Sequence, residues 1–296
     1  MKRSLLKVNS MEDILIDSFV YIICAIIMFV TIYPFYYILV ISFNEGVDAT
    51  LGGIYWLPRK LTFENYEKFF SDIKWLMGLG VTVLRTLIGS VVSVLFTTLV
   101  AYGLSFKELK YRKLYMLIII VSMYFSGGII PYYMLLKQLT LIDKFSVYII
   151  PGALNIFFIL VGLSFFADIP PSLRESAKID GAGEFKVFRK IILPISMPFI
   201  ATCLLFIGVG HWNNWFDSAF FIRNKNLRTL SYLMMEVINS TQVSAQTQQF
   251  GGGKQTITTL SVQAAAMMVA TLPIICVYPF LQRYFVTGIM IGSVKE

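Results

Sequence analysis

Aromatic and amide side chains stand next to one another in the segment Trp212-Asn213-Asn214-Trp215-Phe216-Asp217. Aromatic faces can stack on sugar rings, and amides can hydrogen-bond to hydroxyl groups, so the segment could bind a carbohydrate. The same residue types also gather where a membrane helix meets water, and both interpretations stay open. The candidate substrate contacts are Trp212, Asn213, Asn214 and Trp215, with Asn155 and Tyr124 as further candidates for a polar pathway.

Ionisable groups are scarce within the long apolar stretches of the chain. Arg85 lies beside one of them and is expected to snorkel to the interface, His211 lies near the end of another, and Asp168 and Asp217 lie at stretch ends. Ion-coupled carriers usually carry ionisable groups inside their spans. Because no chain of acids crosses these stretches, we expect the energy for any transport to come from outside this chain.

The sequence also lacks the patterns of a nucleotide or metal site. The segment Gly251–Thr256 superficially resembles a phosphate loop, but positions 248 and 255 are Gln where that loop needs Gly and a Ser or Thr. The three cysteines, Cys24, Cys203 and Cys276, are widely spaced inside apolar runs, which argues against a disulfide framework or a zinc site. We therefore expect a chain that is not an enzyme and binds no metal or cofactor of its own.

The composition indicates that lipid is the solvent of much of the chain. Hydrophobic residues make up 57% and charged residues 14%, with a mean hydropathy of +0.72, against about 45–50% and about 25% in soluble domains. A membrane helix needs about 20 apolar residues. Six uncharged stretches meet this need: Phe19–Phe43, Thr86–Phe106, Leu114–Leu136, Phe145–Ala167, Ile191–Phe216 and Gln255–Gln282. The sequence predicts an all-α membrane protein with six transmembrane helices.

The orientation follows from Lys and Arg in the short connections. The short loop Ser105–Lys113 carries four basic residues, as expected of a cytoplasmic connection. This bias explains the net charge of +8 better than nucleic-acid binding does. We expect both termini to be cytoplasmic, with residues 1–18 as an N-terminal segment, 19–287 as the six-span domain and 288–296 as a cytoplasmic tail.

The cytoplasmic loop 169–190 between the fourth and fifth spans has an unusual pattern. Pro170 and Pro171 stop the preceding helix, and Ser172 is placed to cap a new one. Asp180-Gly181 then ends that helix, because Gly accepts a left-handed turn. A second short helix is predicted over Glu184–Lys190. The apolar residues of this loop suit docking to a partner protein.

The same loop carries a longer motif, Glu175-Ser176-Ala177, three residues, Gly181, nine residues, Ile191, any residue, Leu193-Pro194. It resembles the coupling loop of binding-protein-dependent ABC importers, with Ser176 in place of the usual Ala, and the chain is similar to their type I permease fold. The resemblance implies that the short helix sits in a cleft of an ATPase subunit, where Glu175 pairs with a basic residue, Ala177 packs closely and Gly181 supplies the turn. The coupling residues implied are Glu175, Ser176, Ala177, Asp180, Gly181, Ala182, Leu193 and Pro194.

Two further segments resemble the carbohydrate branch of that family, in particular the six-span permease of maltose-type importers. One is the first external loop, with Leu57-Pro58 followed by Thr62–Tyr66, and the other is the C-terminal segment Gln282–Lys295. The Trp212–Asp217 segment is similar to the permeases of complex-oligosaccharide importers. The tail is implied to reach the ATPase subunits through Gly288, Gly292, Ser293, Val294 and Lys295.

These resemblances imply a permease of the bacterial plasma membrane that imports a carbohydrate. The implied partners are a second, different permease chain, two ATPase subunits that use ATP and Mg²⁺, and an extracellular solute-binding protein that the external loop 217–254 approaches; no nucleic acid is expected. Two alternatives remain, a permease of the same superfamily for another solute such as a polyamine or phosphate, and an ion-coupled secondary carrier without an ATPase.

Overall fold

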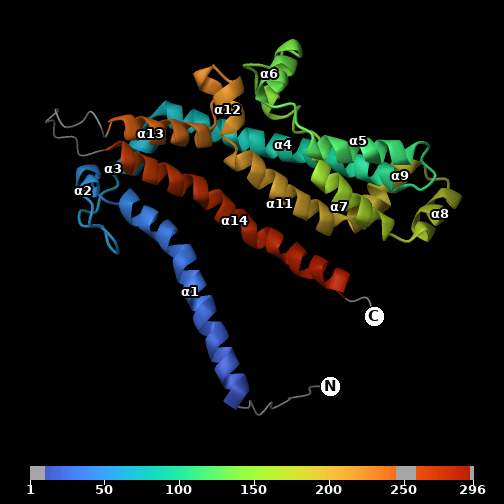
Figure 1. Ribbon diagram of the computed structural model, residues 1–296, viewed down its shortest axis with the longest axis horizontal. Coiled ribbons are helices and arrows are strands. Elements are labelled where there is room, and N and C mark those ends of the chain that lie inside the picture. The colour runs from blue at the N-terminus through green and yellow to red at the C-terminus, as the bar shows by residue number, and fades with distance from the viewer. Residues whose placement is uncertain (1–10, 245–257, 294–296) are drawn as a thin grey trace. The chain divides into compact units, whose positions relative to one another are not determined.

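The computed structural model describes residues 11–244 and 258–293 (Figure 1). Regular structure in these residues is helical, apart from one isolated bridge between Asn44 and Leu61. The α-helices are α1 (Met11–Ser42), α2 (Gly46–Thr50), α3 (Glu64–Ser71), α4 (Ile73–Ser105), α5 (Arg112–Tyr124), α6 (Ile129–Gln138), α7 (Ile156–Ala167), α8 (Pro171–Ile179), α9 (Glu184–Val187), α10 (Leu193–Ile195), α11 (Met197–Asn213), α12 (Phe216–Phe221), α13 (Leu230–Ser244) and α14 (Thr259–Ser293). The 3₁₀-helices η1 (Phe145–Tyr148) and η3 (Lys225–Leu227) and the π-helix η2 (Phe188–Ile192) complete the set.

The chain divides into two compact units, residues 1–69 with 248–268 and residues 70–247 with 269–296. In the first unit the loop after α1 is tied back onto the end of that helix. The side-chain amide of Asn65 is fully buried and donates to the carbonyls of Ser42 and Asn44, both at 2.9 Å. The hydroxyls of Ser42 and Tyr66 are 2.8 Å apart. The segment Thr62–Tyr66 therefore fixes the point at which α1 ends.

The second unit is built around α4, against which α7 and α11 pack (Figure 1). Aromatic rings from α7 and α11 fill the space beside a stretch of α4 that carries small side chains. Ala101 of α4 is fully buried, and Phe166 and Phe199 lie in the same cluster with ring centroids 5.7 Å apart. Small residues let helices approach closely in a membrane, where burial in lipid alone does not drive them together. The buried hydroxyl residues of α4 are Thr82, Ser90, Ser93, Thr97 and Thr98.

Candidate spans number up to six by length and composition within the described residues, which agrees with the predicted all-helical, six-span architecture. Three are single helices: Ile14–Ser42, Ile73–Ser105 and Leu260–Val277. Three are pairs of helices bent at a short break: α5 with α6 at 119°, α7 with α8 at 73°, and Glu184–Ile195 with Met197–Asn213 at 79°. The orientation of the termini and the division at residues 18 and 287 stay predictions.

The predicted span Ile191–Phe216 is bent at Ser196, between α10 and α11. Two further predicted spans also differ from continuous helices. Leu114–Leu136 is interrupted at Phe125–Gly128, where the chain turns from α5 into α6. Phe145–Ala167 is α-helical from Ile156 onward, and its first part contains only the short η1. Pro and Gly explain both differences, since Pro131 and Pro151 cannot donate helical hydrogen bonds and the adjacent glycines weaken helices.

Candidate functional site

The predicted coupling helix is α8, and its end has the geometry of a glycine-capped helix. The amide of Ala182 donates to the carbonyl of Ala177 at 2.9 Å, and the amide of Gly181 donates to the carbonyl of Lys178 at 3.0 Å. Gly181 has φ +77°, in the left-handed region that glycine adopts at little cost. The predicted turn at Asp180-Gly181 is confirmed. The predicted start is wrong, because α8 begins at Pro171 after Pro170 and the side chain of Ser172 is not its N-cap.

The two faces of α8 differ in what they contact. Ala177 is buried in the core of this chain together with Val187 and Phe188, so the expectation that its methyl group packs against an ATPase is corrected. The outward face carries the exposed side chains of Glu175 and Ser176, and the hydroxyl of Ser176 donates to the carbonyl of Ser172 at 2.9 Å. Large apolar side chains beside them are also exposed: Leu173 at 40%, Ile179 at 86% and Phe185 at 71%.

Charged groups fasten α8 to its neighbours. Arg174 donates to Glu184 at the start of α9 at 2.9 Å, and Lys178 pairs with the same carboxylate. These hydrogen bonds hold the pKa of Glu184 below its usual range, and the one from Lys178 has the largest effect. The guanidinium carbon of Arg174 also lies 3.8 Å from the ring centre of Phe106, directly after α4. The α8 helix is thereby attached to α9 and to the end of the central helix α4.

The motif ends in an unusual helical turn. The predicted helix Glu184–Lys190 is α-helical only to Val187, and the π-helix η2 follows, with the amide of Leu193 donating to the carbonyl of Phe188 five residues earlier. Pro194 has no amide hydrogen to offer in an ordinary α-helical register, which a wider turn at this point accommodates. Leu193 packs against the core, whereas Pro194 is exposed.

A hollow of about 360 Å³ lies between α8 and the end of α4. Its lining includes Tyr102, Phe106, Arg174, Glu175 and Lys178. Glu175, predicted to pair with a basic residue of a partner, borders this open space, and the exposed Ile179 follows it by one helical turn. This combination of a glycine turn, exposed apolar groups and two carboxylates, Glu108 and Glu175, beside a hollow suits the docking of another protein.

The aromatic and amide segment lies at a break between α11 and α12. Trp212 is 8% exposed and its indole nitrogen donates to the carbonyl of Ala270 at 3.1 Å, so its ring belongs to the interior and the interpretation of it as a sugar platform is corrected. Asn214 accepts from the amide of Asp217 through its side chain at 3.2 Å. Asn213 and Trp215 are the two members of the Trp212–Trp215 set whose side chains are exposed.

The remaining two pathway candidates have different roles in the structure. The side chain of Asn155 caps α7 by accepting from the backbone amide of Phe158 at 3.1 Å. The backbone amide of Asn155 donates to the hydroxyl of Thr97 at 3.0 Å. Asn155 is therefore used in holding α7 against α4. Tyr124 is 78% exposed at the end of α5, beside the break in that bent pair.

Arg85 contradicts the expectation that it snorkels to the interface. It is 1% exposed, forms an ion pair with Asp217 and donates to the carbonyl of Asn214 at 2.9 Å. Its guanidinium carbon lies 4.5 Å from the ring centre of Tyr148. The sequence did not predict this pairing, although Arg85 beside one apolar stretch and Asp217 at the end of another were the available signal.

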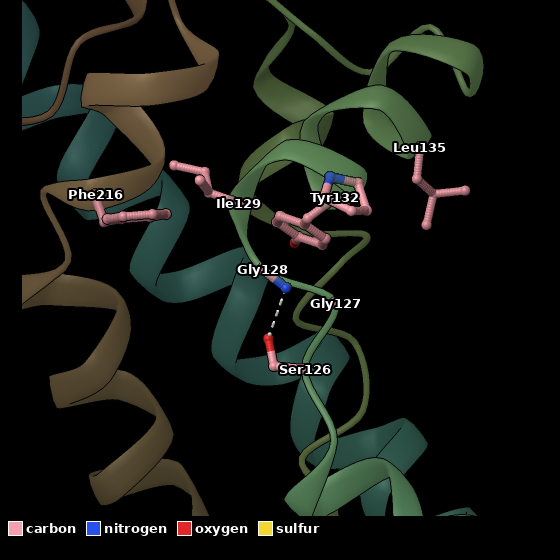
Figure 2. A pocket seen from close by; sticks show the side chains of 8 residues that line it. Ser126, Gly127, Gly128, Ile129, Tyr132, Leu135 and Phe216 are labelled. Carbon is pink, nitrogen blue, oxygen red and sulfur yellow. Dashed lines mark hydrogen bonds between the residues drawn. The ribbon is translucent and has the colours of Figure 1, made fainter.

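A second cavity, of about 520 Å³, opens at the break between α5 and α6. It is lined by Ser126, Gly127, Gly128, Ile129, Pro131, Tyr132, Leu135 and Phe216. Figure 2 shows the rings of Tyr132 and Phe216, from separate helices, on either side of Ile129. Of these residues, Phe216 lies in the Trp212–Asp217 segment considered from the sequence for carbohydrate binding, and none was named there as an individual substrate contact.

Some predicted positions lie outside the described residues. Val294 and Lys295 are among them, and for Gly288, Gly292 and Ser293 only the helical course of α14 is described. Residues 245–254 of the external loop 217–254 also lie outside. The described part of that loop contains α12, η3 and α13, and Glu236 of α13 pairs with Lys74 at 3.2 Å and with Arg228 at 3.0 Å.

Comparison with known proteins places this geometry in context. The model of the family "binding-protein-dependent transport system inner membrane component" matches residues 99–291. The chain is 38% identical over 268 residues to protein LplC of Bacillus subtilis, covering 90% of each chain. It is 34% identical to the polygalacturonan/rhamnogalacturonan transport system permease protein YtcP of the same organism, covering 96% of this chain and all of that one. A crystal structure of a bacterial ABC transporter involved in the import of the acidic polysaccharide alginate matches with a TM-score of 0.82 and 26% identity, covering 93% of this chain and 98% of that chain.

Proposed function

This chain belongs to the family of inner membrane components of binding-protein-dependent transport systems, and from that premise we propose that it is the permease subunit of an ATP-driven importer of a carbohydrate. The family is a transport component, so the chain is a transport subunit rather than an enzyme. The family and the apolar helices also make it a multi-pass membrane protein. The fold it shares with the alginate importer covers nearly the whole chain.

The observation that carries the ATP-driven part of the proposal is the surface around α8. The exposed apolar side chains Leu173, Ile179 and Phe185 of α8 and α9 are costly to leave in water, and the chain between Ile179 and Phe185 turns at Gly181. Two ATPase subunits would bind this surface and its counterpart on a second, homologous permease. ATP and Mg²⁺ would be used by those subunits, since Gly251–Thr256 lacks two of the residues that a phosphate loop requires.

The substrate class is supported by the relatives. YtcP is described as a permease for polygalacturonan and rhamnogalacturonan, and the structural neighbour imports alginate. Further relatives are described as permeases for arabinooligosaccharides and for melibiose, raffinose and stachyose. All of these descriptions name carbohydrates of two or more linked sugar units, and we propose an oligosaccharide for this chain.

The working cycle follows from these parts. An extracellular solute-binding protein would deliver the oligosaccharide to the outer face, near the loop 217–254. Closure of the ATPase pair on ATP would push α8, and the contacts of Arg174 with Phe106 and Glu184 would carry that movement into α4 and α9. The α4 helix packs against α7 and α11. Its displacement would therefore open the transport pathway to one side of the membrane and close it to the other.

Copurification tests the ATPase partnership directly. We expect ATPase subunits to copurify with the wild-type chain and to be lost from Gly181→Pro, because Pro cannot adopt the positive φ of this turn. Glu175→Ala should weaken the association, whereas Glu64→Ala, in the first external loop, should leave it unchanged. Absence of any ATPase from the wild-type preparation would contradict the proposal and would favour an ion-coupled carrier.

A further inference from the structure

The break between α5 and α6 places non-helical backbone inside the membrane. The α5 helix begins at Arg112 beside the basic loop and has 13 residues, which span about 20 Å of a hydrocarbon layer about 30 Å thick. With Arg112 at the edge of that layer, we expect Phe125–Gly128 to lie within it. Non-helical backbone at this depth is tolerated only where it is buried in protein or lines a water-filled cavity.

The hydrogen bonds of this segment show which of the two applies. The amide of Gly128 donates to the hydroxyl of Ser126 at 3.3 Å, as Figure 2 shows. The backbone amides of Ser126 and Gly127 have no hydrogen-bond acceptor within the described part of the chain. The carbonyl of Gly127 has no helical donor either, because Pro131 lacks an amide hydrogen. All three residues of Ser126–Gly128 are exposed, so these polar groups are available to water or to a hydroxyl-rich ligand.

Aromatic rings border the same space. Tyr132 of α6 and Phe216 of α12 both line the cavity of about 520 Å³ and are 38% exposed each. Phe216 is brought here by the break after α11, which the contacts of Arg85 with Asn214 and Asp217 hold in place. Ring faces beside a few unpaired backbone donors and acceptors form the combination that suits a sugar ring, with its apolar faces and its hydroxyl rim.

We infer that the cavity at the α5–α6 break is a subsite for one sugar ring of the transported oligosaccharide, with Tyr132 and Phe216 against its faces and the backbone of Ser126–Gly127 toward its hydroxyls. This assignment rests on the proposed function. It gives this chain its own contact with the substrate. It also moves that contact from Trp212, which is buried, to residues at two helix breaks.

Cysteine accessibility tests whether water reaches the cavity and whether an oligosaccharide binds in it. Gly127 has no positive φ, and a side chain there would meet only Pro131 at ordinary contact distance, so Gly127→Cys fits. It would be made after Cys24, Cys203 and Cys276 are replaced by Ser. The control is Ile130→Cys, at a position that is 75% exposed but does not line the cavity. The assembled transporter in proteoliposomes is treated with a charged methanethiosulfonate, with and without a pectin digest of short oligosaccharides.

We expect the thiol of the Gly127→Cys variant to react and the pectin oligosaccharides to slow its reaction several-fold, while the reaction of the Ile130→Cys variant does not change. An unreactive thiol in Gly127→Cys would mean that lipid or the second permease fills the space, and would overturn the inference. A reaction rate unaffected by a sugar that is nevertheless transported would overturn it as well and would leave the proposed function standing. If the wild-type transporter takes up none of these oligosaccharides and they do not slow the reaction, both proposals fail.

Uptake kinetics provide the second measurement. Phe216→Ala and Tyr132→Ala should each raise the KM for oligosaccharide uptake roughly tenfold and leave the maximal rate within about twofold, as expected for loss of one aromatic contact. The control is Phe157→Ala on α7, with an exposed ring that does not line the cavity. Equal KM values for Phe216→Ala and Phe157→Ala would contradict the subsite, whatever the sugar transported.

Discussion

Arg85 of α4 and Asp217 of α12 form an ion pair in which the arginine is almost fully buried. The guanidinium also binds the carbonyl of Asn214 and lies over the ring of Tyr148. The hydroxyl of Tyr148 in turn donates to the carbonyl of Leu227 at 2.7 Å. One cation thereby fixes the course of the chain from the end of α11 to η3, and an unpaired charge at this place would be costly.

Removing one member of this pair should destabilise the protein. Arg85→Met leaves Asp217 buried without its partner, which is expected to cost about 3–5 kcal/mol. Thermal unfolding of the detergent-solubilised protein should show a clearly lower midpoint for Arg85→Met. The double variant Arg85→Met/Asp217→Leu should recover most of the loss, since two apolar groups leave no buried charge. A midpoint for the double variant as low as that of the single variant would show that other contacts of Arg85 dominate.

Arg174 should matter for coupling more than for folding. Its ion pair with Glu184 is partly exposed, and such pairs contribute about 0–1 kcal/mol, so Arg174→Ala should fold normally. The loss of its contact with Phe106 should instead raise the number of ATP molecules hydrolysed per sugar imported. Lys178→Ala is the matched control, because it removes the other pair with Glu184 but no contact with Phe106. Equal ATP-to-sugar ratios in the two variants would contradict this role.

The glycine turn after α8 allows a substitution test with an internal control. Gly181→Ala introduces a side chain at φ +77°, with an expected cost of about 1–2 kcal/mol. Nothing lies within 4 Å of the added carbon, so that cost comes from the backbone. ATPase copurification should fall for Gly181→Ala and recover partly for Gly181→Asn, which tolerates this region better. Gly183→Ala should have no effect, because Gly183 has ordinary φ and equally open surroundings. An equal loss for Gly181→Ala and Gly183→Ala would exclude the turn as the cause.

Acidification should loosen the junction between α8 and α9. The pKa of Glu184 is lowered by its hydrogen bonds to Lys178 and Arg174, so the folded junction favours the ionised form. A lowered folded pKa contributes stability that is present above the unfolded value, about 4.3, and is lost as the pH falls through the folded value. Hydrogen exchange, corrected for its intrinsic pH dependence, should show weaker protection of Glu184–Val187 at about pH 3 than at about pH 6. Glu184→Gln should show weak protection of this segment at both pH values. If the variant shows the same pH dependence as the wild type, groups other than Glu184 cause the effect.

Local patterns in the sequence predicted the features that depend on nearby residues. The apolar stretches are long enough to mark the candidate spans, and Asp180-Gly181 marks the end of α8 because its geometry is set within one turn of helix. The direction of Ala177 could not be predicted in this way. Its burial depends on Val187 and Phe188, which reach it only after the chain has reversed at Gly181.

The features that could not be predicted depend on contacts between residues far apart in the sequence. Arg85 and Asp217 are 132 positions apart, and neither stretch alone shows that they meet. The burial of Trp212 was not predictable from its own segment, because its indole binds the carbonyl of Ala270, 58 positions later. Gly127, Gly128 and Pro131 are residue types that weaken or interrupt a helix. The cavity there requires Phe216 from another helix, which only the fold supplies.

The most direct test of the account is oligosaccharide uptake by the complete transporter in proteoliposomes. The sample would contain this chain, its partner permease, the ATPase pair and the binding protein, and the readout would be accumulation of labelled pectin oligosaccharides with and without ATP. The account predicts accumulation that requires ATP hydrolysis, stops in Gly181→Pro and persists when ion gradients are dissipated. Uptake that continues without ATP and collapses with the ion gradient would contradict it.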